Sequence, residues 1–227
     1  MSEAIVLLSG GLDSATALAV AVEKGHDIVA LTFDYGQRHK REVESARKIA
    51  KHYKIKDHIV IPLDLGRLLK SSLTQKHLVI PEGGPKGEVS SGIPSTYVPA
   101  RNMIFLSIAT SIAESRGAEH VYIGVNAVDY SGYPDCTPYF IAAFQRAVNV
   151  GTKSGKEGNA IRLDAPLINL SKAQIIRKAV GKDVPLELTW SCYKGGKKAC
   201  GKCDSCRLRL KGFALAGIKD PLEYEVG

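Results

Sequence analysis

The stretch LLSGGLDSATALA, residues 7–19, places two glycines and an aspartate between an apolar run and an alanine-rich segment. The apolar run predicts a short buried strand, and the alanine-rich segment predicts a helix that begins near Ser14. Glycines in such a turn let the backbone approach a ligand closely, and the unpaired N–H groups of a first helical turn attract anions. Residues 9–14 therefore predict a binding site for phosphate or pyrophosphate.

Asp13 is the unusual residue of this turn, because a carboxylate repels phosphate groups. A carboxylate beside phosphates is explained if a Mg²⁺ ion lies between them. Ser9 and Ser14 add hydroxyl donors to the backbone N–H groups. Neither G-x-x-x-x-G-K-[ST] nor G-x-G-x-x-G is present, which disfavours a P-loop NTPase or a dinucleotide-binding protein. An ordinary Gly-Gly turn that begins a helix is the alternative interpretation.

Strand-like and helix-like segments alternate along the chain. Predicted strands cover residues 4–9, 27–35, 58–64, 120–126 and 160–167, and predicted helices cover 14–24, 38–54, 101–117, 137–152 and 171–180. This alternation predicts a parallel sheet with helices on both faces, a Rossmann-like three-layer α/β sandwich. We expect this domain to cover residues 1–184, with a small C-terminal segment over 185–227 packed on it.

Composition narrows the class of partner. The chain has 227 residues, of which 44% are hydrophobic, and a formal net charge of +8. Such a charge favours anionic ligands such as nucleotides, although a lysine-rich solvated surface explains it equally well. The N-terminal apolar run is too short for a signal peptide, and no run is long enough to cross a bilayer. We therefore expect a cytoplasmic protein without a membrane partner.

Four cysteines near the C-terminus have the spacing C-x7-C-x2-C-x2-C. Four thiolates satisfy tetrahedral Zn²⁺ and leave no open position for catalysis, so this spacing predicts a structural zinc site. An iron–sulfur cluster is the alternative, and disulfides are disfavoured in a chain without an export signal. The predicted ligands are Cys192, Cys200, Cys203 and Cys206.

The six residues SGGLDS, 9–14, resemble at every position the S-G-G-x-D-S pyrophosphate loop of the N-type ATP pyrophosphatases. Members of that superfamily cleave ATP between the α- and β-phosphates and commonly adenylate an oxygen of the substrate. The ATP-binding residues that the resemblance implies are Leu8, Ser9, Gly10, Gly11, Leu12, Asp13, Ser14, Ala15, Thr16, Phe33 and Asp34. Phe33 and Asp34 would contact adenine and ribose, and a core aromatic and a turn former are the alternatives for them.

Four further segments discriminate within the superfamily. They are FDYGQRH (33–39), YVPARNMIFLSIA (97–109), GVNAVDYSGYPDCTPYF (124–140) and SCYKGGKKACGKCDSCRLRLKGF (191–213). Together, and in this order, they resemble the 7-cyano-7-deazaguanine synthase family over nearly the whole chain. The resemblance implies ATP-dependent conversion of 7-carboxy-7-deazaguanine and ammonia to the nitrile, in the pathway to queuosine-type tRNA bases. It also implies a homodimer with one zinc ion per subunit.

This chemistry gives roles to individual residues. Adenylation turns an oxygen of the carboxylate into part of AMP, which ammonia displaces to give an amide, and a second adenylation permits loss of AMP to leave the nitrile. Each activation needs charge neutralised at the α-phosphate or the substrate carboxylate. The predicted catalytic residues are Asp13, Ser14, Arg101 and Lys172. A surface or helix-end charge is the alternative for Arg101 and Lys172.

The segment DYSGYPD, 129–135, supplies carboxylates and aromatic rings just past a predicted strand. A deazaguanine presents N–H donors and a flat ring, which suit such side chains. The predicted substrate-binding residues are Asp129, Tyr130, Tyr133 and Asp135. A Gly-Pro turn with capping aspartates is the alternative interpretation.

Two other functions remain open from the residues alone. A tRNA-modifying enzyme that adenylates a base within RNA fits the net charge of +8, but 227 residues leave little room for an RNA-binding module. Direct binding of nucleic acid is therefore not expected. A zinc-stabilised nucleotide-binding module without catalysis is the second alternative, and the intact loop with Asp13 argues against it.

Overall fold

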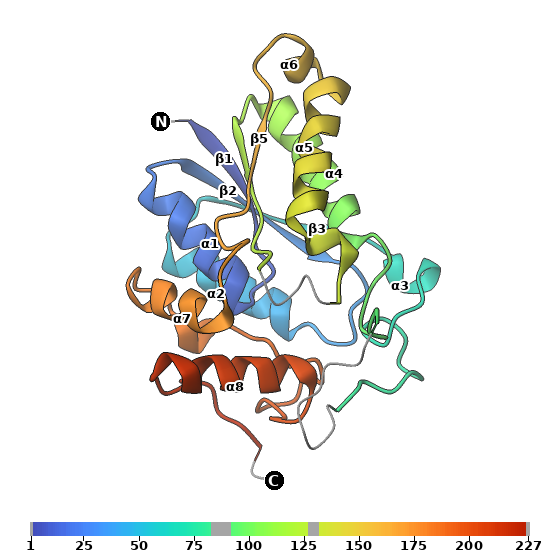
Figure 1. The fold of residues 1–227 in the computed structure, drawn as a ribbon, viewed down its shortest axis with the longest axis vertical. Helices are drawn as coiled ribbons and strands as arrows, with labels where there is room; N and C mark the ends of the chain where they lie inside the picture. Colours follow the sequence, from blue (N-terminus) through green and yellow to red (C-terminus); the bar gives the residue numbers. More distant parts are fainter. Residues whose placement is uncertain (1, 83–91, 127–131, 226–227) are drawn as a thin grey trace.

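The computed structural model describes residues 2–82, 92–126 and 132–225 and contains a five-stranded parallel sheet with helices on both faces (Figure 1). The strands are β1 (Glu3–Leu7), β2 (Asp27–Asp34), β3 (Asp57–Pro62), β4 (His120–Tyr122) and β5 (Arg162–Asp164). The α-helices are α1 (Leu12–Glu23), α2 (Arg41–His52), α3 (Leu65–Leu68), α4 (Arg101–Arg116), α5 (Pro138–Gly151), α6 (Lys153–Lys156), α7 (Lys172–Val180) and α8 (Asp204–Ala216). The predicted three-layer α/β arrangement is confirmed. None of the described helices has the length and apolar character that crossing a bilayer requires.

The strand order, β3-β2-β1-β4-β5, reverses direction beside β1. The chain winds outward from β1 through β2 to β3, and then crosses to β4 on the other side of β1. In open α/β sheets ligands bind at such a reversal, beyond the carboxyl ends of the strands. The SGGLDS turn follows β1 directly, so it lies at the reversal.

Alternate residues of β1 pack into two separate hydrophobic layers. Ala4 and Val6 belong to the layer formed with α1, α2, α7 and α8. Ile5 and Leu7 belong to the opposite layer, formed with α4 and α5. Because both faces of the sheet are covered, β1 is a continuous apolar run rather than an alternating one.

The C-terminal segment is joined to the main core. Its helix α8 lies beside α7 (Figure 1), and Phe213 of α8 is buried in the same layer as α1 and α7. Arg209 of α8 is 2% exposed and forms an ion pair with Asp220, Nε to Oδ2 2.8 Å. The cysteine spacing predicted a small metal-binding segment but not this helix.

Residues 74–99 contain no helix or regular strand in their described parts, 74–82 and 92–99, and we refer to them as a loop. Glu82 forms an isolated antiparallel bridge with Cys203. Thr96 is buried and reaches the site described below. The described parts of this loop therefore join the cysteine segment to the carboxyl edge of the sheet.

Candidate active site

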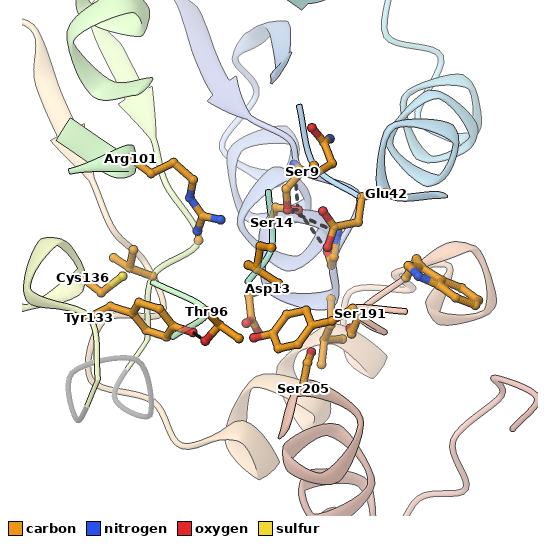
Figure 2. Close-up of a pocket in the computed structure, with 18 of the residues that line it drawn as sticks. Ser9, Asp13, Ser14, Glu42, Thr96, Arg101, Tyr133, Cys136, Ser191 and Ser205 are labelled. Atoms are coloured by element: carbon orange, nitrogen blue, oxygen red, sulfur yellow. Dashed lines mark hydrogen bonds between the residues drawn. The ribbon is translucent and has the colours of Figure 1, made fainter. Parts of the chain in front are cut away.

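A cavity of about 670 Å³ lies at the carboxyl ends of β1, β2 and β4 (Figure 2). The SGGLDS turn, the starts of α2 and α4, the start of α7 and the first half of α8 all contribute side chains to its walls. Cavities of this size, lined by apolar surface with a few convergent polar groups, are typical small-molecule sites. Segments that are far apart in the sequence therefore meet at the predicted position.

We call residues 9–14 the phosphate loop. The Oγ of Ser14 accepts a hydrogen bond from the main-chain N–H of Ser9 at 3.2 Å and donates to the carbonyl of Gly11 at 3.0 Å. Gly10 has φ +87°, and a Cβ there would lie 2.2 Å from the main-chain oxygen of Glu42. A Cβ at Gly11 would make only ordinary contacts, the nearest at 3.5 Å. Packing thus requires the first glycine, whereas the second leaves room for a ligand.

The two carboxylate oxygens of Asp13 differ in their contacts with the described residues. Its Oδ2 accepts from Lys172 Nζ at 2.6 Å and from Asn126 Nδ2 at 3.0 Å. Its Oδ1 is buried and accepts no hydrogen bond from any residue that the structure describes. An anionic oxygen without a partner, beside a loop built for phosphate, fits a Mg²⁺ ligand. The predicted Asp13 and Lys172 are therefore brought together.

Gly212 of α8 makes the position of Lys172 possible. A Cβ at Gly212 would lie 2.5 Å from Cγ of Lys172, so the lysine stem lies directly over this glycine. Lys172 is the first residue of α7, which a Ser171–Gln174 capping box begins. The helix start and the glycine together direct the ammonium group toward Asp13.

Arg101 is the first residue of α4 and points into the cavity (Figure 2). It donates to the hydroxyl of Tyr35 at 3.2 Å, and its guanidinium lies 5.5 Å from the centre of the Tyr35 ring. The preceding Ala100 has a left-handed conformation, φ +52°, which is costly for a residue with a side chain. Strain of this kind is concentrated at functional positions, in agreement with a fixed cation here.

Asp135 lies outside the cavity wall and caps α4. It is 6% exposed, and its Oδ2 accepts from the main-chain N–H of Asn102 at 2.8 Å. Tyr133 does line the cavity, where its hydroxyl and that of Thr96 are 2.7 Å apart. Asp129 and Tyr130 lie outside the described residues. The four predicted substrate-binding residues thus have different outcomes, and only Tyr133 is seen at the site.

The two residues that were predicted to contact adenine and ribose also have different positions relative to the cavity. Phe33 lines the cavity and stacks on Phe105, with ring centres 4.0 Å apart and planes inclined by 7°. Asp34 does not line the cavity and forms an ion pair with Lys40. An aromatic wall is therefore present without the adjoining carboxylate.

The remaining residues of the predicted ATP site divide in the same way. Leu8 and Leu12 line the cavity. Ala15 and Thr16 are buried within α1, where the Thr16 hydroxyl donates to the Leu12 carbonyl at 2.8 Å. Ala15 and Thr16 therefore support the loop from behind.

Glu42 is a site residue that the sequence did not suggest. Its side chain lines the cavity near the phosphate loop (Figure 2), and no described residue forms a hydrogen bond or ion pair with its carboxylate. Burial raises the pKa of Glu42 to about 7, against the opposing effect of the Arg101 charge. From sequence alone, a glutamate in a first helical turn indicates only an interaction with the helix dipole. The other polar lining residues that were not predicted are Tyr35, Gln37, Arg38, His39, Thr96, Asn102, Ser191, Tyr193, Asp204, Ser205, Arg207, Arg209 and Lys211.

The four predicted metal ligands converge. Cys192, Cys200, Cys203 and Cys206 are all buried, and their sulfur atoms lie within 4.8 Å of one another. The sulfur atoms of Cys200 and Cys206 are 3.9 Å apart. Ligands about 2.3 Å from a tetrahedral metal lie about 3.8 Å from each other, so these positions fit a four-thiolate metal site.

The fifth cysteine is apart from this cluster. Cys136 is buried at the cavity wall, and its sulfur accepts from Asn102 Nδ2 at 3.1 Å. Cys136 packs at the start of α4 and supplies no ligand to the four-cysteine cluster.

The parallel sheet, the reversal at β1 and the SGGLDS loop define an α/β protein of the N-type ATP pyrophosphatase class. The chain belongs to the family described as queuosine biosynthesis protein QueC, whose model matches residues 3–217. It is 55% identical to the 7-cyano-7-deazaguanine synthase of Acetivibrio thermocellus over 224 residues, which are 99% of this chain and 98% of that one. The protein of the same name from Stutzerimonas stutzeri is 52% identical, over 98% of each chain. The predicted family is confirmed.

A solved structure shares the fold at much lower sequence identity. The NMN synthetase from Francisella tularensis is 19% identical, with a TM-score of 0.52 over 96% of this chain and 78% of that one. This structural similarity supports the fold assignment alone and carries no information about the substrate.

Proposed function

We propose that this protein catalyses the ATP-dependent conversion of 7-carboxy-7-deazaguanine and ammonia to 7-cyano-7-deazaguanine, with release of AMP and pyrophosphate. The observation that carries the proposal is the phosphate loop at the strand reversal, with Oδ1 of Asp13 buried and unpartnered among the described residues. The names of relatives 52–55% identical over nearly the whole chain support the product. The protein is then a carbon–nitrogen ligase of queuosine biosynthesis.

The phosphate loop is proposed to hold the two phosphoryl groups that leave as pyrophosphate. Ser9 and Ser14 supply hydroxyl groups, and the open face of Gly11 lets the backbone approach. Asp13 would hold Mg²⁺ through its free oxygen, and the bound ion would neutralise phosphate charge. The ammonium group of Lys172, which is paired with Asp13, is close enough to neutralise phosphate charge as well.

Arg101 is proposed to orient the substrate carboxylate for attack on the α-phosphorus. Its hydrogen bond to Tyr35 fixes the guanidinium before substrate arrives, so little order is lost on binding. The same cation neutralises charge as the carboxylate oxygen becomes part of AMP. Asp135 contributes by capping the helix that carries Arg101, rather than by contacting the substrate.

The aromatic wall is proposed to hold the two flat rings. Phe33, which stacks on Phe105, is proposed to contact adenine. Tyr133 is proposed to contact the deazaguanine through its ring and its hydroxyl. The proposed contact of Asp34 with ribose, and those of Asp129 and Tyr130 with the substrate, stay predictions.

Glu42 is proposed to accept protons from nitrogen. Every hydrogen of ammonia must leave its nitrogen before the nitrile is complete. A carboxylate that faces the cavity and whose pKa burial raises to about 7 can take up a proton near neutral pH. The two anionic substrates repel this carboxylate, whereas ammonia and the amide offer it N–H groups.

The four-cysteine cluster is proposed to hold one structural zinc ion per subunit. The buried, closed arrangement leaves no position for a substrate, as is typical of structural zinc sites. Metal analysis that finds iron and a brown protein would favour the iron–sulfur alternative. A homodimer and a cytoplasmic location stay predictions.

The test is to incubate the protein with ATP, Mg²⁺, ¹⁵N-ammonium and 7-carboxy-7-deazaguanine, and to follow the base by mass spectrometry. We expect the amide and then the nitrile, each with one ¹⁵N atom, and no reaction when ATP is omitted. An unchanged base would contradict the proposal. Consumption of ATP only when tRNA is supplied would support the tRNA-modifying alternative.

A further inference from the structure

Trp190, the single tryptophan of the chain, forms hydrogen bonds with both the phosphate loop and the four-cysteine cluster. Its main-chain N–H donates to the carbonyl of Gly10 in the phosphate loop at 2.9 Å. Its indole Nε1–H donates to the carbonyl of Cys192, the first cysteine of the cluster, also at 2.9 Å. Trp190 is only 5% exposed, so both hydrogen bonds are shielded from water. One buried residue therefore connects the phosphate loop to the four-cysteine cluster.

The hydrogen bond to Gly10 fixes the direction of the next main-chain N–H of the phosphate loop, that of Gly11, which donates to Oγ of Ser9 at 3.4 Å. The carbonyl of Gly10 and the N–H of Gly11 belong to the same planar, trans peptide, so they point in opposite directions. Holding the carbonyl toward Trp190 therefore directs the N–H of Gly11 away from Trp190. On the α2 side Gly10 packs directly against the main chain of Glu42 and Ala46, so closely that a Cβ there would collide with both.

Arg41, the first residue of α2, holds the cysteine segment at two points. Its guanidinium lies 4.4 Å from the centre of the Trp190 ring, a cation–π arrangement. The same group donates to the carbonyl of Lys197 at 2.7 Å. Because Lys197 lies between Cys192 and Cys200, the helix that supports Gly10 also contacts the segment between the first two cysteines.

The segment between Cys192 and Cys200 has no helix or regular strand to order it. The sulfur of Cys192 accepts from the main-chain N–H of Cys200 at 3.3 Å and of Lys194 at 3.4 Å. Structural metal sites of this kind supply much of the folding free energy of the segments they close. A metal ion at the cluster would therefore order the carbonyl groups that Trp190 and Arg41 contact.

We infer that Trp190 is a positioning residue through which metal binding at the four-cysteine cluster strengthens nucleotide binding at the phosphate loop. This inference rests on the proposed function of the loop as the ATP site. Linkage is reciprocal, so the nucleotide must tighten metal binding by the same factor. Couplings of this type are commonly between about 5-fold and 150-fold, and we expect about tenfold here.

The experiment measures two dissociation constants with α,β-methylene-ATP and Mg²⁺, a combination that cannot be split between the α- and β-phosphates. Calorimetry gives the affinity for the analogue, and competition with a chelator gives the affinity for Zn²⁺ with and without the analogue. In the native chain we expect the analogue to tighten Zn²⁺ binding about tenfold. Trp190→Phe keeps the ring and the main-chain N–H but removes the indole donor to Cys192. In this variant we expect the analogue to tighten Zn²⁺ binding by less than about threefold.

Tyr224→Phe is the matched control. The Tyr224 hydroxyl donates to Asp220 at 2.6 Å, and its main chain bridges to Ala199 beside the cluster, away from the phosphate loop. This variant is expected to weaken Zn²⁺ binding in both conditions and to keep the factor. In turnover, metal-loaded Trp190→Phe should raise KM for ATP about fivefold and leave kcat within about twofold of the native value.

The outcomes separate the inference from the proposed function. If the native, metal-loaded protein does not bind the analogue, the proposed function is contradicted. If it binds the analogue but Zn²⁺ affinity does not respond, the coupling alone is overturned. An unchanged factor and an unchanged KM in Trp190→Phe would likewise overturn the role of Trp190. Measurements on metal-loaded Trp190→Phe do not depend on a folded metal-free protein.

Discussion

Two polar clusters at opposite ends of the sheet show how a structural carboxylate differs from a functional one. At the amino end, His120, the first residue of β4, contacts Oδ2 of Asp164 at 2.7 Å, and Asp164 is 8% exposed. Its Oδ1 lies 3.6 Å from Lys24 and 3.4 Å from Arg162. At the carboxyl end, Asp13 engages one oxygen and leaves the other buried without a described partner.

The difference lies in what completes each cluster. The charge of Asp164 is satisfied by the protein itself, so the cluster needs nothing else to be stable. None of the described residues satisfies the second oxygen of Asp13, which leaves that oxygen to water or a ligand, and an unsatisfied buried oxygen costs about 1–3 kcal/mol. Stability is thus reduced at the carboxyl end in exchange for a prepared site, as is usual at active sites.

The largest expected effect comes from Asp13→Asn. We expect AMP formation to fall by about 10³-fold, because the neutral amide holds a cation beside the phosphates far more weakly than the carboxylate does. Asp164→Asn is the matched control at the other end, where we expect lower stability and unchanged AMP formation per folded molecule. Chromatography of the nucleotides measures both variants, with circular dichroism as the check on folding. If the two variants lost activity equally, the distinction between the two ends would fail.

Lysines that contact the two aspartates provide a second pair. Lys172→Met removes the ammonium group beside Asp13, and we expect kcat/KM to fall about 10²-fold. Lys24→Met removes an ammonium group that is half exposed near Asp164, and we expect activity to be unchanged. Steady-state kinetics at saturating Mg²⁺ measures both. Native kcat/KM in Lys172→Met would assign that lysine a purely structural role.

The effect of Glu42 on stability tests whether a buried carboxylate at the carboxyl end destabilises the folded protein. The pKa of Glu42 is raised from 4.5 to about 7 in the folded protein, so folding is favoured while the group is protonated. This contribution is complete below pH 4.5 and is lost as the pH rises through about 7. Glu42→Gln should therefore raise the free energy of unfolding by about 1–2 kcal/mol at pH 8 and by little at pH 4.5.

Glu44→Gln, an exposed position on the same helix, is the control for Glu42→Gln. Urea unfolding at the two pH values measures both variants. A Glu42→Gln variant that is less stable at pH 8 would show that the ionised carboxylate has a partner in the folded protein.

The smallest effect is expected at His26, whose ring lies 4.6 Å from that of His120 in the amino-end cluster, with the two planes inclined by 42°. Burial, and next the charge of His120, lower the pKa of His26 below its usual value of 6.5. Stability from this group is present above pH 6.5 and is lost as the pH falls through the lower, folded-state pKa. His26→Gln should reduce the loss of stability between pH 7.5 and pH 5 by less than about 1 kcal/mol. A larger acid sensitivity in the variant would contradict this assignment.

Features written in a short stretch of sequence were predicted well. The loop at residues 9–14 and the four cysteines have fixed spacings, and the apolar runs predicted all five strands. The strands predicted at 120–126 and 160–167 were longer than β4 (His120–Tyr122) and β5 (Arg162–Asp164), because their apolar residues continue into segments that pack on the core. Helix α8 was not predicted because its cysteines and basic residues mask the helical pattern.

Features that depend on distant partners could not be predicted. Asp135 is of a residue type that commonly binds ligands. The start of α4 lies beside it, however, and the main-chain N–H of Asn102 donates to its carboxylate. Glu42 looks like an ordinary first-turn glutamate until the phosphate loop packs against its backbone. Trp190 gives no sign in the sequence of its hydrogen bond to Gly10, because the two residues meet only through the fold.

The central claim is that the phosphate loop directs cleavage of ATP between the α- and β-phosphates, onto an oxygen of the substrate. It is tested most directly by supplying 7-carboxy-7-deazaguanine labelled with ¹⁸O in its carboxylate and recording the ³¹P and mass spectra of the products. We predict AMP that carries ¹⁸O, together with unlabelled pyrophosphate. Formation of ADP and orthophosphate, or of AMP without the label, would contradict the account.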